Sequence, residues 1–317
     1  MPQKTDTITA IAPASVANVS VGFDIFGFSV PILYDAITAT KISEKGNVEI
    51  SSISGTTTNL PFDAEKNTAG FAAHKLLDEL DVDFGVTLKI EKGIPLGSGL
   101  GGSAASAVAA VTAINGLLEK PLDKGRLLKY ALMGESIASG SVHGDNVSAS
   151  LFGGLICFRN NNPESQYGGK VLQIPFPNIF CVLLHPDIVI ETKIARSIIK
   201  PQISLKDHVM QNMFLSSFLV GCYTNDLGLI AESLHDIIIE PQRAHLIPKF
   251  GELKAKTMES GAIAFGISGA GPSMFAFCKS EKTIAKITNN IEIIKSELPY
   301  NLDIYSSQID TRGSYIP

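Results

Sequence analysis

Alternating apolar and polar residues predict β-strands in the first part of the chain. The segments 7–12, 36–42 and 48–53 alternate in this way. The clearest case is GVTLKIE, residues 85–91, in which every second residue from Val86 to Ile90 is apolar. Because successive side chains of a strand point to opposite faces, this segment is expected to be a half-buried strand.

Apolar residues at helical spacing predict helices between and after these strands. Asn67 is a suitable N-cap for a helix whose apolar positions continue to Leu80, and the alanine-rich segment 103–118 is expected to be a closely packed helix. Further helices are expected near 125–138, 191–199, 205–221, 225–238, 245–260 and 281–296. Further strands are expected at 153–158, 179–186, 262–268, 273–278 and 302–309.

The polar, turn-rich segment RNNNPESQYGGK, residues 159–170, is the best candidate for a domain boundary. Strands and helices occur on both sides of it, which predicts an α+β protein of two domains. We place them at residues 1–165 and 166–317, and a chain of 317 residues is long enough for two ordinary cores.

Composition indicates a globular protein, since 45% of residues are hydrophobic and 18% are charged. A formal net charge of −5 provides no basic surface for nucleic acid. No apolar run has the length of a signal peptide or a membrane span. The four cysteines are widely spaced within apolar runs, as buried thiols in a reducing compartment would be. We therefore expect a cytoplasmic protein that binds neither nucleic acid nor membrane.

The segment GIPLGSGLGGSAAS, residues 93–106, joins the strand that ends near Glu91 to the alanine-rich helix. Gly97, Gly99 and Gly102 match G-x-G-x-x-G. A dinucleotide site needs a strand that ends in an acid about 20 residues later, and here LLEKPLDKG has an acid but no strand before it. No Lys-Ser/Thr follows as in a Walker loop, and no H-R-D accompanies the motif as in protein kinases. A glycine loop before a helix N-terminus still favours a polyphosphate. The alternative is a tight strand–helix turn with no ligand.

Three separated motifs resemble those of the galactokinase, homoserine kinase, mevalonate kinase and phosphomevalonate kinase superfamily. PLGSGLGGSAAS (95–106) resembles its phosphate loop, although Gly102 stands where a serine is usual. APASVANVSVGFD (12–24) resembles its N-terminal motif, and GISGAGPS (266–273) its C-terminal glycine motif. The pieces GES at 134, HGDN at 143, TKIAR at 192 and EPQRAHLIP at 240 resemble the homoserine kinase branch in particular.

This resemblance implies an N-terminal domain like ribosomal protein S5 domain 2 and a ferredoxin-like α/β-plait C-terminal domain. It implies the transfer of a phosphoryl group from ATP to L-homoserine, a step towards threonine. Phosphoryl transfer depends mainly on positioning and charge stabilisation. The loop expected to surround the triphosphate consists of Ile94, Pro95, Leu96, Gly97, Ser98, Gly99, Leu100, Gly101, Gly102, Ser103 and Ala104.

Mg²⁺ binds few protein oxygens and bridges them to phosphate oxygens. By resemblance, Ser103 and Glu135 supply these oxygens. The alternative for Glu135 is an ordinary charge on a solvated helix face.

The HGDN segment supplies Asp145 and Asn146. In mevalonate kinase-like relatives, an aspartate is often assigned as the base that accepts the hydroxyl proton. We expect Asp145 to be the base and Asn146 to position the hydroxyl, with direct attack and no base as the rival. Nearby cations would lower the pKa of Asp145 and make it a weak base. An Asx turn is the alternative for both residues, and His143 is left with a structural role.

Homoserine is a zwitterion, so its site needs cations for the carboxylate and acceptors for the ammonium group. Arg196 and Arg243 fit the first role through bidentate geometry, and Asp24 and Asn18 fit the second. Taken singly, each arginine could instead be a surface ion-pair partner.

Two other functions remain open at this point. One is a sister kinase acting on mevalonate or a diphosphocytidyl-methylerythritol, which would lack the zwitterion site. The other is a non-catalytic binding module, for which a basic face and a damaged phosphate loop would be expected. A homodimer is possible by resemblance, and residues 55–68 are a candidate contact for the nucleobase.

Overall fold

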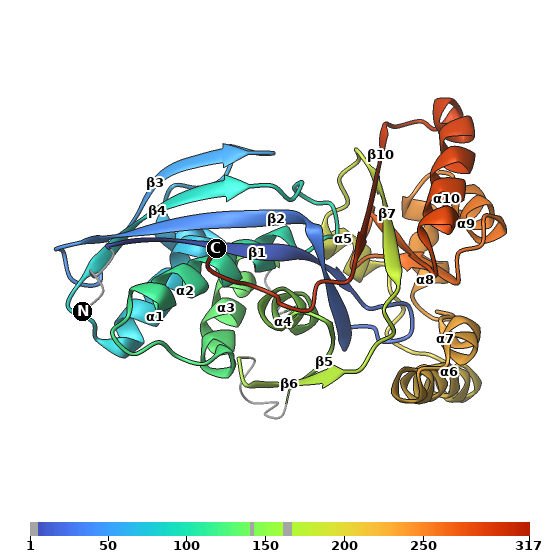
Figure 1. Ribbon diagram of the computed structural model, residues 1–317, viewed down its shortest axis with the longest axis horizontal. Coiled ribbons are helices and arrows are strands. Elements are labelled where there is room, and N and C mark those ends of the chain that lie inside the picture. Colours follow the sequence, from blue (N-terminus) through green and yellow to red (C-terminus); the bar gives the residue numbers. More distant parts are fainter. Residues whose placement is uncertain (1–5, 140–142, 161–166) are drawn as a thin grey trace.

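The computed structural model describes residues 6–139, 143–160 and 167–317. A six-stranded sheet occupies one side of the molecule and a four-stranded sheet the other (Figure 1). The first sheet has the order β3-β4-β2-β5-β6, with β1 paired to β2, and its pairs are antiparallel except β3–β4. Its strands are β1 (Thr7–Ala17), β2 (Phe26–Ile42), β3 (Val48–Gly55), β4 (Gly85–Lys92), β5 (Leu155–Asn160) and β6 (Gly169–Ile174).

Strand β2 organises the first sheet because it pairs with three other strands. Its C-terminal half pairs with β4 from Asp35 to Ile42, and its first residues, Phe26–Phe28, pair with β5. Strand β1 follows it along most of its length, with a register shift between Pro13 and Ala14. This shift lets the long pair bend towards the second sheet.

Four helices pack on one face of the first sheet (Figure 1). They are α1 (Thr68–Leu80), α2 (Gly102–Leu117), α3 (Lys124–Ser139) and α4 (Gly144–Phe152). Helix α2 is buried on nearly all sides, which its small side chains make possible. The expected N-cap of α1 is confirmed, because the Asn67 side chain accepts hydrogen bonds from the amides of Ala69 and Gly70.

The second sheet has the strand order β10-β7-β9-β8, and all neighbouring strands are antiparallel. Its strands are β7 (Phe180–Pro186), β8 (Ala264–Ile267), β9 (Met274–Cys278) and β10 (Leu302–Gln308). Numbered within this half of the chain, the order is 4-1-3-2, with helices between the first and second strands and between the third and fourth. This is the ferredoxin-like arrangement, so the expected α+β class is confirmed.

Six α-helices accompany the second sheet. They are α5 (Thr192–Ser197), α6 (Leu205–Thr224), α7 (Leu227–Ser233), α8 (Glu240–Arg243), α9 (Phe250–Glu259) and α10 (Glu281–Ile294). Short 3₁₀ turns occupy Ala64–Lys66, Ala244–Leu246 and Lys295–Glu297. The helix expected over 225–238 ends at Ser233. The helix expected over 245–260 is split into a 3₁₀ turn that ends at Leu246 and α9, which begins at Phe250.

The two sheets share apolar contacts that hold the halves together. The ring of Phe28 in β2 lies 5.7 Å from that of Phe275 and 5.1 Å from that of Phe277, both in β9. All three are fully buried. Beyond β10 the chain returns to the first sheet, where Tyr315 and Ile11 exchange backbone hydrogen bonds.

The expected domain division between residues 165 and 166 lies outside the described residues. On its C-terminal side, β6 pairs with β5 from Gly169 to Ile174. A division that keeps the first sheet intact would lie after Ile174. Among the described helices, none is both long and apolar enough to cross a membrane.

Candidate functional site

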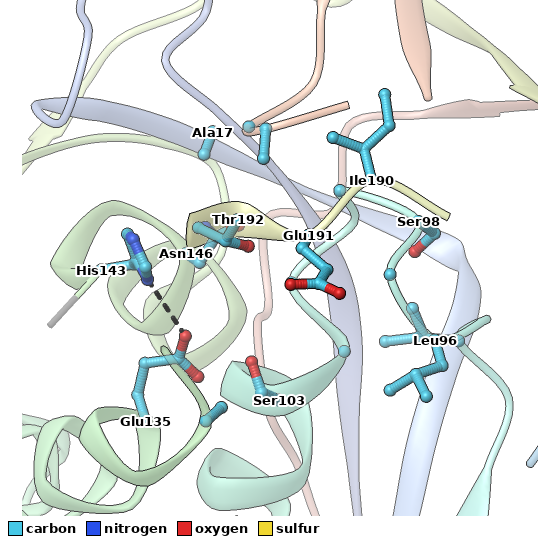
Figure 2. A pocket seen from close by; sticks show the side chains of 18 of the residues that line it. Ala17, Leu96, Ser98, Ser103, Glu135, His143, Asn146, Ile190, Glu191 and Thr192 are labelled. Carbon is cyan, nitrogen blue, oxygen red and sulfur yellow. Dashed lines mark hydrogen bonds and ion pairs between the residues drawn. The ribbon is translucent and has the colours of Figure 1, made fainter. Parts of the chain in front are cut away.

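A cavity of about 510 Å³ lies between the two sheets. Its lining comes from the β1–β2 connection, the glycine loop, α2, α3, α4, the β7–α5 connection and the glycine turn after β8. Figure 2 shows it from close by, with Ser103, Glu135, His143, Asn146 and Glu191 around one part of it. The tertiary structure therefore collects segments from both halves of the chain at one place.

The glycine loop leads from β4 into α2 along the cavity wall. Residues 94–99 and 101–103 line the cavity, whereas Leu100 and Ala104 are fully buried and do not. Gly101 precedes α2 with φ 67°, and no side chain caps this helix. The first amide groups of α2 are thus available to an anion in the cavity, and the helix dipole favours negative charge there.

Close packing explains why glycines are needed in this loop. A Cβ at Gly99 would lie 2.5 Å from the Ser268 carbonyl oxygen, and one at Gly101 would lie 2.1 Å from Ser15 Oγ. The Ser268 hydroxyl donates to the Gly99 carbonyl at 2.7 Å, and the Ser273 amide donates to the Ser98 carbonyl at 3.1 Å. The C-terminal glycine motif therefore packs directly on the glycine loop.

A buried charged group that sequence reasoning missed supports both ends of the loop. Lys92 Nζ forms an ion pair with Asp35 and donates to the Gly102 carbonyl and to Ser106 Oγ, each at 2.8 Å. The other Asp35 oxygen accepts from the amides of Gly93 and Ile94. Asp35 is fully buried, and Lys92 is 4% exposed at the cavity wall. The signal was present, because the alternation of β4 continues and places Lys92 on the same inward face as Ile90.

Glu135 of α3 is 3% exposed, which rules out the alternative of a solvated helix-face charge. One of its carboxylate oxygens lies 3.3 Å from His143 Nδ1, and the other, Oε2, is buried with no hydrogen-bond partner among the described residues. The Ser103 hydroxyl and this carboxylate face the same part of the cavity (Figure 2). A buried carboxylate oxygen without a partner suits a hard cation such as Mg²⁺.

Asp145 and Asn146 lie in the first turn of α4, so the HGDN segment is the beginning of a helix rather than a loop. Asn146 Oδ1 accepts a hydrogen bond from Ser15 Oγ at 2.8 Å. Asp145 is 2% exposed, and burial, together with the charge of Asp24, raises its pKa to about 6. This direction differs from the lowered pKa expected beside Mg²⁺ and a basic residue, because loss of hydration and Asp24 outweigh His143 and the backbone hydrogen bonds.

Asp24 and Arg196 form a bidentate ion pair at the cavity, with N–O distances of 2.9 and 2.8 Å. Their side chains are 42% and 40% exposed, so each remains accessible. The hydrogen bond to Asp24 raises the pKa of Arg196. Arg196 Nε is buried and has no hydrogen-bond partner in the part of the chain that the structure describes. Asn18 holds this region in place, since its side chain accepts from the Asp24 amide and donates to the Gly269 carbonyl.

Arg243, at the end of α8, completes the charged group. It is 3% exposed and donates to the carbonyls of Ala195 and Gly269 at 3.1 and 2.8 Å. Burial and the neighbouring Arg196 lower its pKa to about 10, so it stays protonated at neutral pH. The Phe23 ring lies 5.2 Å from Arg243 Cζ and 5.5 Å from Arg196 Cζ. Sequence reasoning did not single out Phe23, which orients both guanidinium groups.

The cavity also contains residues that the sequence did not indicate, and it lacks one segment that was expected. His143, Glu191 and Thr192 line it, and Glu191 is directed into it from the side opposite Ser103 (Figure 2). None of the described residues 55–68 lines the cavity, although the Thr56 hydroxyl donates to the Ile94 carbonyl at the start of the loop.

Comparison with family models finds two matches in this chain. Residues 67–154 match the model described as GHMP kinases N terminal domain, and residues 218–294 match GHMP kinases C terminal. The first match contains the glycine loop, Glu135 and Asp145, and the second contains Arg243 and the glycine turn after β8.

Individual proteins are similar over most of the chain. A homoserine kinase of Chlorobium phaeobacteroides (strain BS1) is 37% identical over 98% of this chain and 99% of its own length. A homoserine kinase of Xylella fastidiosa (strain M12) is 42% identical over 84% of this chain and 81% of its own.

Solved structures show the same likeness. The crystal structure of homoserine kinase from Cytophaga hutchinsonii superimposes with a TM-score of 0.93 at 37% identity, covering 100% of this chain and 99% of that chain. L. major mevalonate kinase, with a TM-score of 0.71 and 16% identity over 96% of this chain and 95% of its own, shares the fold.

Proposed function

This chain belongs to the GHMP kinases, and we propose that it is a homoserine kinase, which transfers the γ-phosphoryl group of ATP to the side-chain hydroxyl of L-homoserine. The observation that carries the substrate assignment is the charged group of Asp24, Arg196 and Arg243 in the same cavity as the glycine loop. A zwitterion needs both signs of charge at one end of the site, and a neutral sugar needs neither.

The glycine loop and α2 are proposed to bind the triphosphate. Their amide groups and the helix dipole stabilise negative charge without a lysine in the loop. Ser103 and Glu135 would hold Mg²⁺, which would neutralise charge on the phosphate oxygens. The Asp35–Lys92 pair keeps both ends of the loop in place, so its amide groups need little reorganisation during transfer.

Asp145 is proposed to accept the proton of the homoserine hydroxyl. A pKa of about 6 leaves most of the carboxylate ionised near neutral pH and makes it a stronger base than an ordinary aspartate. Asn146 would position the hydroxyl oxygen, and its bond to Ser15 fixes the side chain for that purpose.

The Asp24–Arg196 ion pair is proposed to open when homoserine binds. The substrate ammonium would take the place of Arg196 beside Asp24, and its carboxylate would bind Arg196 and Arg243. One ion pair is exchanged for two, and the buried Arg196 Nε gains an acceptor. A substrate with a carboxylate but no ammonium would leave Asp24 unpaired, so mevalonate should be a poor substrate.

The test is ADP release from MgATP in the presence of L-homoserine, L-threonine, mevalonate or galactose. We expect turnover with L-homoserine, and we expect Asp24→Ala to abolish it while ATP binding persists. Asp83→Ala, which changes an exposed acid outside the cavity, is the matched control and should turn over normally. Turnover with mevalonate and not with homoserine would refute the substrate and indicate a sister kinase. Absence of any turnover in a folded protein that binds ATP would refute all four substrates.

Three further properties stay predictions. The enzyme is expected to act in the cytoplasm, and a homodimer is allowed by the resemblance. Its domains are expected to divide near residue 165, or after Ile174 if the first sheet is kept intact. Limited proteolysis followed by mass spectrometry would locate that division.

A further inference from the structure

Arg243 is the last residue of a helix of only one turn, α8 (Glu240–Arg243). A single turn fixes several backbone dihedral angles in exchange for few hydrogen bonds, so it forms only where other groups hold it. In this turn the amides of Gln242 and Arg243 both donate to the Ile239 carbonyl at 3.0 Å. The place of the Arg243 guanidinium in the cavity therefore depends on whatever fixes the residues just before α8.

The carboxylate of Asp236 fixes those residues. Its Oδ1 accepts hydrogen bonds from the amides of Ile238 and Ile239 at 3.0 and 2.7 Å, and its Oδ2 accepts one from the Glu240 amide at 2.9 Å. Amides at the start of a helix have no partner within the helix, and their bonds to a carboxylate are stronger than bonds between neutral groups. One carboxylate thus holds three successive residues in the conformation from which α8 follows.

Asp236 does not line the substrate cavity, but it shares a smaller cavity with Arg243. Arg243 lines both the large cavity and the second one, whose volume of about 10 Å³ is roughly the space of one water molecule. The other acid of this second cavity, Glu240, forms an ion pair with Lys254. Burial raises the pKa of Asp236, and its backbone hydrogen bonds and the charge of Arg243 oppose that rise. Asp236 can therefore act on the substrate through the guanidinium of Arg243 and not by contact.

We propose that Asp236 is a positioning residue for Arg243 and thereby sets the affinity of the site for the substrate carboxylate. This inference rests on the proposed function, in which Arg243 binds that carboxylate. Arg243 donates to the carbonyls of Ala195 and Gly269 at 3.1 and 2.8 Å, so a displacement of α8 by about 1 Å would break at least one of these bonds and turn the guanidinium away. Asp236 prevents that displacement through its three amide bonds, and its charge favours the protonated guanidinium.

The first test is steady-state kinetics of Asp236→Asn with MgATP and L-homoserine. Asparagine has nearly the same shape, but it carries no charge, and its amide nitrogen cannot accept a hydrogen bond from the Glu240 amide. We expect the KM for homoserine to rise about tenfold, with kcat and the KM for ATP within about twofold of the parent values. A homoserine KM that changes by less than about twofold, or equal changes in both KM values, would overturn the proposal.

Asp226→Asn is the matched control. Asp226 accepts hydrogen bonds from the amides of Gly228 and Leu229 at the start of α7, so it has the same capping role, but it is exposed and lines neither cavity. The kinetic constants of this variant should equal those of the parent. A parent protein that does not turn over homoserine would refute the proposed function. Turnover by the parent without a selective effect of Asp236→Asn would refute only the positioning role.

The second test separates positioning from a merely structural role. In the Arg243→Lys background, Asp236→Asn should change the homoserine KM by less than about twofold, because the guanidinium that Asp236 positions is absent. Additive effects of the two substitutions would overturn the proposal. Asp236→Ser, which keeps a capping oxygen without the charge, is made in parallel, and the same selective rise in the homoserine KM is expected. Failure of both Asp236 variants to fold, measured by circular dichroism, would assign Asp236 to the fold alone and overturn the positioning role.

Discussion

Replacing Asp145 by asparagine should stabilise the protein while it impairs catalysis. Burial and the charge of Asp24 raise the pKa of Asp145 from 3.8 to about 6. An acid whose pKa is raised by folding holds its proton more tightly when folded, so ionising it lowers the free energy of unfolding. The penalty is nearly absent below pH 3.8, grows between pH 3.8 and 6, and is constant above pH 6.

The magnitude follows from the shift of about two pKa units. The ionised carboxylate costs roughly 3 kcal/mol at pH 8 and about 0.5 kcal/mol at pH 4. Asparagine has nearly the same shape and can still accept the hydrogen bond from the Asn146 amide. Asp145→Asn should therefore raise the melting temperature by about 4 °C at pH 8 and change it little at pH 4.

The assay is thermal unfolding of both proteins without ATP at several pH values, together with kcat at pH 8. We expect kcat to fall by at least about 100-fold if Asp145 is the base, whereas a fall below 10-fold would favour direct attack without a base. Asp83→Asn, at an exposed position, should change stability by less than about 0.5 kcal/mol at either pH. A variant that is no more stable than the parent at pH 8, or whose gain is the same at pH 4, would refute the reasoning.

Three further changes test the loop and the substrate site. Gly101→Ala should cost at least about 2 kcal/mol, because alanine is unfavourable at φ 67° and its Cβ would meet Ser15; an unchanged melting temperature would contradict this. Asp35→Asn should lower the free energy of unfolding, measured with denaturant, by about 3–5 kcal/mol, since it leaves Lys92 buried beside a neutral side chain. A near-neutral effect would show that the loop does not depend on the Asp35–Lys92 pair. Arg243→Lys should raise the KM for homoserine about tenfold and leave the KM for ATP unchanged, because lysine cannot replace both carbonyl contacts and still reach a carboxylate. Equal changes in both KM values would indicate a general distortion of the cavity.

Local patterns were sufficient for most elements of the fold. The alternation of residues 85–91, the N-cap at Asn67 and the alanine-rich segment after the glycine loop all correspond to observed elements. Strand β6 and helix α4 were missed. Strand β6 begins within the turn-rich segment 159–170, and α4 begins in a segment whose composition is equally suitable for a turn. The Asp35–Lys92 pair was also missed, since Asp35 lies 57 residues from Lys92 and only the pairing of β2 with β4 brings them together.

The sequence by itself determined that a glycine-rich loop joins a strand to a helix, and its separated motifs pointed to a small-molecule kinase. These conclusions rest on local properties, namely glycine conformations, side-chain periodicity and residues near one another along the chain. Only the tertiary structure decided that Asp24 pairs with Arg196, that Glu135 has a buried oxygen with no partner among the described residues, and that Asp145 has a raised pKa. Each of these depends on burial and on charges from distant segments, because hydration is lost and charges interact only where the fold brings them together.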